Sequence, residues 1–547
     1  MKKNSFLEGT LIATFAIVLV KIIGMLYVIP FYALVGSKGS ALYGYGYNIY
    51  LTFLAISSAG LPTAISKITN EYETLGLKEA KVRSYKLGRL ICFIISIIVF
   101  LILFIFSKQV ALLILGNLKG GNTIDDVSLI IKCVSLSILV VPFLSVSRGY
   151  LQGHKYITPS SNSQLIEQIV RVFVILAGSF LTIKVFDGTI KLAVAIAILG
   201  AFISGIVAYL YIIKKINNNK KSLSLDEKLP RDKITNKEII KKIIYYAVPF
   251  IIINVAINIY NFVDMILILR TLNYLKFDAD VVEFITSAIS TWTCKINMIV
   301  VAIANGMVIS LIPAIVSAFV LKKWKEVESK LNKALQIIIL ISTPMVVGLA
   351  FLATPVWTVF YGTSYYGPIV LRMAIINALF TNLYMATSST LQGLNKYKTV
   401  YKATLGGFIL NAILDVPMML LFNKLGIYPF YGALVSTALC YIFAVLMGLH
   451  DLHKNNNISY KDTIKVLGKV MISIAILIIT LFIIRIFIPL NVDGKLKNVL
   501  VIAVYTLIGI IVYGFTTYKL GLLNKVFGEK YLNKVIKKLT FGKVSKD

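Results

Sequence analysis

The sequence predicts an all-α polytopic membrane protein with 14 transmembrane helices, arranged as two six-helix parallel repeats plus two extra C-terminal helices. Three observations support this prediction. The 547 residues are 58% hydrophobic and only 15% charged, with a mean hydropathy of +0.83, whereas a soluble domain carries about 25% charged residues. The apolar residues form long uninterrupted runs. The surplus of basic residues, 56 Lys and Arg against 24 Asp and Glu, falls mainly between those runs.

Fourteen apolar runs are long enough to cross a bilayer as helices, which takes about 20 mostly apolar residues. Their continuous apolar character, without alternation, argues against a membrane β-barrel. The first run carries Lys21 near its middle and is followed by no small-residue cleavage site, so we expect a retained helix rather than a signal peptide. The approximate cores are residues 10–34, 43–68, 90–115, 127–147, 164–183, 192–213, 243–269, 285–321, 334–357, 369–390, 403–422, 428–448, 470–488 and 498–518.

The basic residues predict the orientation of these helices. If the N-terminus is cytoplasmic and every run crosses, most Lys and Arg residues fall in cytoplasmic segments, as the positive-inside rule expects. We therefore expect a multi-pass protein of the cytoplasmic membrane with both termini in the cytoplasm. A basic balance can also indicate nucleic-acid binding, but this distribution argues against it and favours contact of the basic loops with anionic membrane lipids.

The chain repeats short motifs at an offset of about 240 to 250 residues. Residues 151–153 (Leu-Gln-Gly) after the fourth run return as residues 391–393 after the tenth, and the Pro-containing segment 62–66 returns as 313–317. Two halves of six helices each enter the membrane in the same sense, so an axis along the membrane normal should relate them. The expected organisation is an N-terminal half 1–213, a basic cytoplasmic linker 214–242, a C-terminal half 243–450, helices 13 and 14 over 451–518, and a basic cytoplasmic tail 519–547.

The residues that usually carry enzyme chemistry form no recognisable set. The four cysteines and three histidines lack the spacing of a metal site, and no Ser/His/Asp set can be assembled from them. An enzyme is therefore not expected, and no organic cofactor is indicated. The densest acidic group between runs, Asp278, Asp280 and Glu283, is expected to be a solvated face.

Ionisable residues inside the runs are more informative, because each costs roughly 2.5–3.5 kcal/mol at a helix centre and normally faces a partner or a watery cavity. Lys21 and Lys295 are candidates to line a cavity and meet an anionic headgroup; the alternative, snorkelling to the interface, fits Lys21 poorly. Glu167 and Arg171 are spaced i, i+4 and share one helix face. A self-neutralising structural pair is the favoured interpretation of these two, with substrate contact as the alternative.

A second group of polar residues within the runs is acidic. Asp264 lies in the seventh run, Asn411 and Asp415 are spaced i, i+4 in the eleventh, and Thr437 in the twelfth can add a hydroxyl. Carboxylate and amide oxygens suit a hard cation, so these residues form a candidate site for sodium or a proton. Hydrogen bonding between helices, with Asp264 protonated or paired, is the alternative.

Several motifs together resemble one known family, and the resemblance covers nearly the whole chain. The sequence is similar to the MurJ family of lipid II flippases, in its Gram-positive YtgP-type branch, within the multidrug/oligosaccharidyl-lipid/polysaccharide exporter superfamily. The motifs are residues 24–31 (GMLYVIPF), 43–48 (YGYGYN), 59–67 (AGLPTAISK), 148–154 (RGYLQGH), 167–171 (EQIVR), 391–396 (LQGLNK) and 518–523 (YKLGLL).

The resemblance implies export of a lipid-linked peptidoglycan precursor on undecaprenyl diphosphate by alternating access, in support of cell wall synthesis and cell shape. The cavity cations of the family match Lys21 and Lys295, whereas two further cavity arginines of other members correspond to Tyr27 and a position near Leu54. The family's last two helices imply a groove for the polyprenyl tail. Its sodium-site positions match Asp264, Asn411, Asp415 and Thr437.

Two alternatives remain within the same fold. One is a flippase for another polyprenyl-linked polysaccharide or teichoic acid unit, which the sequence discriminates poorly. The other is a cation-coupled multidrug exporter, which predicts twelve spans and an acidic cavity rather than fourteen spans and a lysine.

Overall fold

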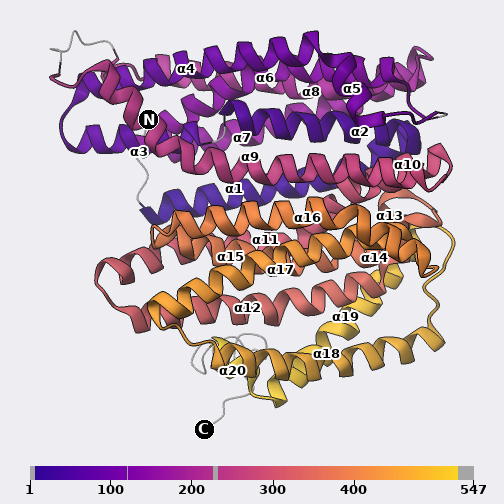
Figure 1. The fold of residues 1–547 in the computed structure, drawn as a ribbon. Helices are drawn as coiled ribbons and strands as arrows, with labels where there is room; N and C mark the ends of the chain where they lie inside the picture. Colours follow the sequence, from indigo (N-terminus) through magenta and orange to yellow (C-terminus); the bar gives the residue numbers. More distant parts are fainter. Residues whose placement is uncertain (1–5, 59, 120, 226–231, 528–547) are drawn as a thin grey trace. The chain divides into compact units, whose positions relative to one another are not determined.

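The structure is a computed structural model that describes residues 6–58, 60–119, 121–225 and 232–527 (Figure 1). Within these ranges every regular element is helical and no strand occurs. The chain divides into two compact units, the first formed by residues 1–295 and 408–436, the second by residues 296–407 and 437–547. The predicted all-α polytopic fold is confirmed, whereas the proposed domain limits remain a prediction.

The first unit contains ten whole α-helices. They are α1 (Phe6–Leu26), α2 (Val28–Ser58), α3 (Leu61–Thr74), α4 (Lys78–Ile105), α5 (Ser107–Leu115), α6 (Ile124–Gly153), α7 (Ile157–Phe180), α8 (Ile190–Asn217), α9 (Asn236–Tyr274) and α10 (Ala279–Ser287). Short π-helical segments extend α7 (Leu181–Val185) and precede α11 (Ala288–Trp292). Helices α2, α4 and α8 all pack against α6, as the ribbon shows (Figure 1).

The second unit contains seven whole helices, and three more have residues in both units. The seven are α12 (Trp324–Phe351), α13 (Ala353–Tyr361), α14 (Tyr366–Ala374), α15 (Ile376–Gly393), α18 (Lys461–Phe487), α19 (Lys495–Lys519) and α20 (Leu522–Phe527). The three shared helices are α11 (Thr293–Val320), α16 (Tyr397–Lys424) and α17 (Pro429–Asn456).

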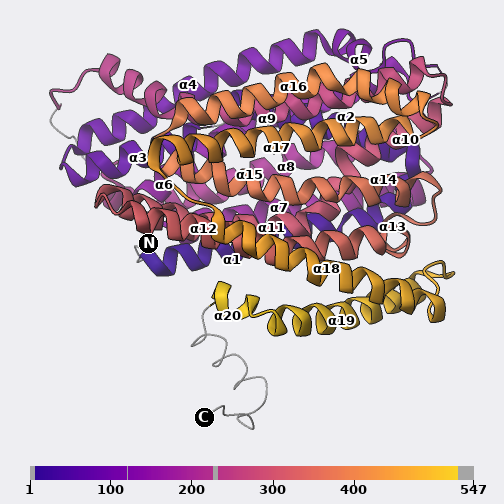
Figure 2. The same cartoon turned by 60° about the horizontal axis from the view of Figure 1, so that its bottom comes forward.

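Thirteen helical segments among the described residues are long and apolar enough to cross a membrane, and the shorter apolar helix Phe15–Leu26 lies in the first predicted run. The helices α18 and α19 pack against one another (Figure 2). Their outward side chains are apolar, with Leu507 61% and Ile510 65% exposed. Since large exposed apolar surfaces are unfavourable in water, these faces are suited to lipid. The count of fourteen spans remains a prediction.

The first predicted run ends in a sharp break. Residues 10–34 fall in α1 and in the first turns of α2, and the chain changes direction at Gly36, which has φ +66° and ψ −169°. That backbone conformation is accessible to glycine because it lacks a Cβ atom. The break separates the segment around Lys21 from the long helical stretch that begins near Gly39.

The predicted linker is anchored rather than freely exposed. Leu223 is fully buried, and its carbonyl accepts a hydrogen bond of 3.1 Å from the Tyr150 hydroxyl. Helix α9 then begins with a capping box, in which Thr235 and Glu238 satisfy each other's backbone N–H groups, and these bonds lower the pKa of Glu238. Residues 226–231 of the linker and 528–547 of the predicted tail lie outside the described residues.

Two glycines bring α6 against α3. A Cβ atom at Gly149 would lie 2.3 Å from the Pro62 carbonyl oxygen, and one at Gly153 would lie 2.6 Å from the Ser66 carbonyl oxygen. The segment 148–154 therefore requires small residues at these two positions because the helix backbones are in near contact.

The substitution Gly149→Ala should lower stability by about 1–3 kcal/mol, because the added methyl group overpacks an interface whose opposing atoms are backbone. The measurement is the apparent melting temperature of the full-length protein in detergent. Gly514→Ala in α19 is the matched control, since no atom lies within 4 Å of its Cβ position. Equal melting temperatures for the two variants would contradict the close approach of α6 and α3.

Candidate functional site

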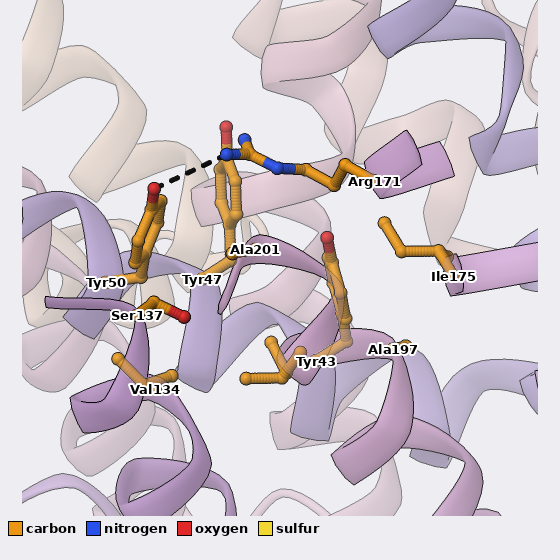
Figure 3. A pocket seen from close by; sticks show the side chains of 10 residues that line it. Tyr43, Tyr47, Tyr50, Val134, Ser137, Arg171, Ile175, Ala197 and Ala201 are labelled. Atoms are coloured by element: carbon orange, nitrogen blue, oxygen red, sulfur yellow. Dashed lines mark hydrogen bonds between the residues drawn. The ribbon is translucent and has the colours of Figure 1, made fainter. Parts of the chain in front are cut away.

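Three tyrosines line one face of α2. Tyr43, Tyr47 and Tyr50 follow the i, i+4, i+7 spacing that places residues on one side of a helix. The rings of Tyr43 and Tyr47 are stacked, with centroids 6.1 Å apart and an interplanar angle of 13°. Figure 3 shows all three rings side by side. Tyr43 and Tyr47 belong to the motif 43–48 and Tyr50 lies outside it, although the spacing of the three residues alone indicates a shared face.

A buried lysine lies at one end of this tyrosine face. Lys295 is 6% exposed, and its Nζ is 4.2 Å from the centroid of the Tyr47 ring and 5.9 Å from that of Tyr27. The Tyr27 hydroxyl is 3.1 Å from the Tyr43 hydroxyl. Aromatic faces attract a cation through their quadrupole, so the lysine is held by rings instead of by a carboxylate. The structure thus brings together the predicted site residues Lys295 and Tyr27.

Two arginines share one carboxylate at the other end. Glu167 accepts a hydrogen bond from Arg171, one turn further along α7, and a second of 2.9 Å from Nη1 of Arg148 in α6. The Arg171 guanidinium also lies 3.5 Å from the Tyr50 hydroxyl. The pair expected from the i, i+4 spacing is present, but Arg148 was missed, because no sequence spacing links α6 to α7.

A small pocket lies between these groups. Its cavity is about 20 Å³, room for about one water molecule. Figure 3 shows the Arg171 guanidinium beside the rings of Tyr47 and Tyr50. The lining residues are Tyr43, Tyr47, Tyr50, Val134, Ser137, Arg171, Ile175, Ala197, Ile198 and Ala201, all of them in the first unit.

Lys21 is partly buried in α1, which packs against α7. Three residues further on, a Cβ atom at Gly24 would lie 3.1 Å from the Gln168 side-chain nitrogen. Within the described part of the chain, no carboxylate pairs with Lys21 and it makes no hydrogen bond. A cation placed this way in an apolar helix has its charge available for an external anion.

The predicted acidic residues meet in the first unit. The Asn411 side-chain nitrogen donates to Asp264 at 3.2 Å and to Asp415 at 3.0 Å. The Ser436 hydroxyl donates to the Asn411 side-chain oxygen at 3.0 Å. All four residues are at least nine-tenths buried. Thr437, the fourth predicted ligand, follows Ser436 in α17 and belongs to the second unit, so its role as a ligand remains a prediction.

This acidic cluster suits a small cation or a proton. Asp415 is fully buried, and one of its oxygens has no hydrogen-bond donor. The Asp264 and Asp415 carboxyl groups both accept from the same Asn411 amide nitrogen, which brings the two carboxyl groups close together. Two neighbouring carboxylates repel each other strongly in a low-dielectric interior. A shared proton or a bound monovalent cation removes this repulsion. Among the described residues, no group of three or more His, Cys, Asp or Glu side chains is arranged to hold a metal ion.

The acidic group Asp278, Asp280 and Glu283, expected to be a solvated face, contains one buried residue. Glu283 is only 2% exposed, and its carboxylate accepts bonds from the backbone and side-chain nitrogens of Asn122 at 2.9 and 2.8 Å. The expectation is wrong for this residue because the loop before α6 folds over it and supplies its hydrogen bonds.

The substitution Asn411→Leu should cost about 2–3 kcal/mol of stability, because both buried carboxyl groups lose their shared donor. The measurement is thermal unfolding in detergent, with Asn423→Leu, on an exposed part of the same helix, as the control. Adding Asp264→Asn to the Asn411 variant should recover part of the loss by removing one charge. A melting temperature unchanged by Asn411→Leu would contradict the observed network.

Comparison with known proteins places the chain in a family. A family model described as "Polysaccharide biosynthesis protein" matches residues 6–319. The chain is 32% identical over 548 aligned residues to the "Lipid II flippase MurJ" of Bacillus subtilis (strain 168), covering 96% of this chain and 97% of that protein. The predicted MurJ resemblance is thereby confirmed.

Solved structures share the fold. "Lipid II flippase MurJ, inward closed conformation" matches with a TM-score of 0.68 and 18% identity, over 93% of this chain and 99% of that one. A multidrug resistance MATE family transporter of the MOP superfamily, in an inward-facing conformation, matches with a TM-score of 0.63 and 15% identity, over 80% and 96%. The chain belongs to the polysaccharide biosynthesis protein family, in the branch that contains the Bacillus subtilis lipid II flippase MurJ.

Proposed function

We propose that this protein is a flippase that exports lipid II, a peptidoglycan precursor linked to undecaprenyl diphosphate, across the cytoplasmic membrane for cell wall synthesis. The observation that carries the proposal is the 32% identity, over nearly the full length of both chains, to a lipid II flippase. The N- and C-termini lie in the cytoplasm in this proposal, as the distribution of basic residues indicates. The transport cycle is alternating access.

The physical problem of such transport is the diphosphate. Moving this charged group through hydrocarbon without partners is prohibitive, so a protein must replace its hydration shell. Lys21 is partly buried with no carboxylate partner among the described residues, and Lys295 lies beside the rings of Tyr47 and Tyr27. In the proposed mechanism these two ammonium groups pair with the diphosphate as it crosses, since bonds between ionised groups are among the strongest hydrogen bonds.

The membrane potential favours the proposed direction. An inside-negative potential is worth about 2.3 kcal/mol per elementary charge per 100 mV, and it drives an anionic headgroup outward. After the headgroup is released, the same potential favours the return of the positively charged cavity lysines toward the cytoplasmic side. In this proposal it therefore favours both the export step and the return step of the cycle.

A cation site at the acidic cluster is the second part of this proposal. Asp264, Asn411 and Asp415 would hold sodium or a proton, with Thr437 as a further proposed ligand. A bound cation neutralises the paired carboxyl groups and links transport to an ion gradient. The unpartnered oxygen of Asp415 supports this proposal, because a buried carboxylate oxygen without a donor is unfavourable in an empty site.

Lys21→Ala should abolish rescue of cells from which the native protein is depleted, because translocation loses one of its two proposed diphosphate partners and falls at least about tenfold. The measurement is lipid II accumulation in the cytoplasmic leaflet together with lysis. Lys21→Arg should retain rescue because it keeps the charge.

Lys108→Ala is the matched control, since Lys108 is 68% exposed and pairs with Asp125. Equal rescue by the parent and the Lys21→Ala variant, both inserted in the membrane, would refute the role of Lys21. Depletion that leaves the wall normal but removes a capsule or teichoic acid would instead assign another polyprenyl-linked glycan as substrate.

Asp264→Ala should remove the dependence of translocation on sodium or on pH, because the variant lacks one of the two carboxylates that hold the cation. The measurement is the initial rate in proteoliposomes, with sodium varied at fixed pH and pH varied at fixed sodium. Asp125→Ala, an exposed aspartate at 72%, is the control. Ion dependence retained in the Asp264 variant would exclude this cluster as the coupling site.

A further inference from the structure

The pocket beside the tyrosine face holds hydrogen-bond donors that lack partners. The Ser137 side chain from α6 is fully buried, and its hydroxyl oxygen has no hydrogen-bond partner. The Nε of Arg171 is likewise buried without a partner, and both residues line the same pocket. Figure 3 shows the Ser137 oxygen and the Arg171 guanidinium on the pocket wall. Buried polar groups in native proteins nearly always have partners, so these two indicate an absent occupant.

The charge around the pocket is positive. Arg148 and Arg171 share the single carboxylate of Glu167, which leaves one positive charge uncompensated. A water molecule would satisfy the free donors but would leave this surplus charge unbalanced. An anion does both, and it gains more in a low-dielectric interior than in water.

The size of the pocket is compatible with a small anion. A cavity of about 20 Å³ has room for about one water molecule, and a monatomic halide is close to that size. The donors are also of the right kind, because a guanidinium N–H and hydroxyl O–H groups donate to a halide without demanding a fixed acceptor geometry.

We propose that the pocket lined by Arg171, Ser137 and the α2 tyrosines binds one small monovalent inorganic anion, with chloride as the physiological candidate. The ion balances the buried surplus of positive charge, and it is separate from both the acidic cation cluster and the lipid-linked substrate. Glu167 is an internal competitor in this arrangement, since its carboxylate occupies the other side of the Arg171 guanidinium and reduces the attraction for a second anion.

The test is halide-dependent stability of the purified full-length protein in detergent. Thermal unfolding is measured while sodium chloride replaces sodium gluconate at constant ionic strength, because gluconate is too large for the pocket. A ligand that binds only the folded state raises its stability in a saturable way, so the melting temperature should rise with chloride and reach a plateau. Bromide should act in the same way as chloride.

Three variants give distinct expected results. Ser137→Ala should weaken apparent chloride affinity about two- to tenfold, as expected for one neutral hydrogen bond. Arg171→Gln should weaken it at least about tenfold, since a charged donor is lost. Glu167→Gln should tighten it several-fold, because the amide still accepts from the arginines but no longer competes as an anion.

The matched control is Glu79→Gln. Glu79 and Arg83 form an i, i+4 pair of similar burial in α4, away from the tyrosine face, so its neutralisation should leave chloride affinity unchanged. Anomalous scattering from a bromide-soaked crystal provides a direct second measurement, with a peak expected beside Arg171 and Ser137.

Melting temperatures that do not depend on chloride, together with no bromide peak, would overturn the proposal in favour of an ordered water. Chloride stabilisation unaffected by Ser137→Ala and Arg171→Gln would also overturn it. Stabilisation by inorganic phosphate but not by chloride, with the same dependence on Arg171, would reassign the pocket to a phosphate group. None of these results depends on lipid translocation, so they leave the proposed transport function to its own test.

Discussion

The cost of an unpaired charge in hydrocarbon is the constraint on which the rest of this structure depends. Several ionisable groups of the first unit satisfy it in different ways. Glu167 lies between two arginines, and Lys295 lies over the ring of Tyr47. Asp264 and Asp415 share the amide of Asn411. Lys21 is the exception, because no group of the described chain compensates its charge.

The tyrosine face of α2 contacts cations that belong to two other helices. Its tyrosines contact Lys295 at one end and Arg171 at the other, so one helix holds cations from both α7 and α11. Tyrosine suits this role because its ring attracts cations while its hydroxyl remains available for hydrogen bonds. Arg148 in turn lies on α6, which Gly149 and Gly153 allow to pack closely against α3. Arg148, the residue before Gly149, is therefore positioned by a backbone contact.

Much of this could be predicted from the sequence where the relevant signal is local. Long apolar runs predict helices that span a membrane, and the i, i+4 spacing predicts the contact between Glu167 and Arg171. The approach of Asp264 to Asn411 was also expected, but from the resemblance and the oxygen chemistry rather than from spacing. Arg148 could not be placed beside Glu167, because contacts between α6 and α7 depend on helix rotation, which composition does not specify. The burial of Glu283 was missed for the same reason, since it depends on how the loop containing Asn122 folds over α10.

Within the first unit, basic and acidic side chains form two separate clusters. The basic groups gather on the α2 face, while the acidic cluster is formed by α9, α16 and α17. Mixed together, these side chains would neutralise one another and leave no site for either kind of ion. Held apart by the fold, each cluster keeps an excess of one sign of charge. The formal net charge of +32 reflects mainly the basic loops, whereas the proposed ion sites depend on a few charged side chains inside the first unit.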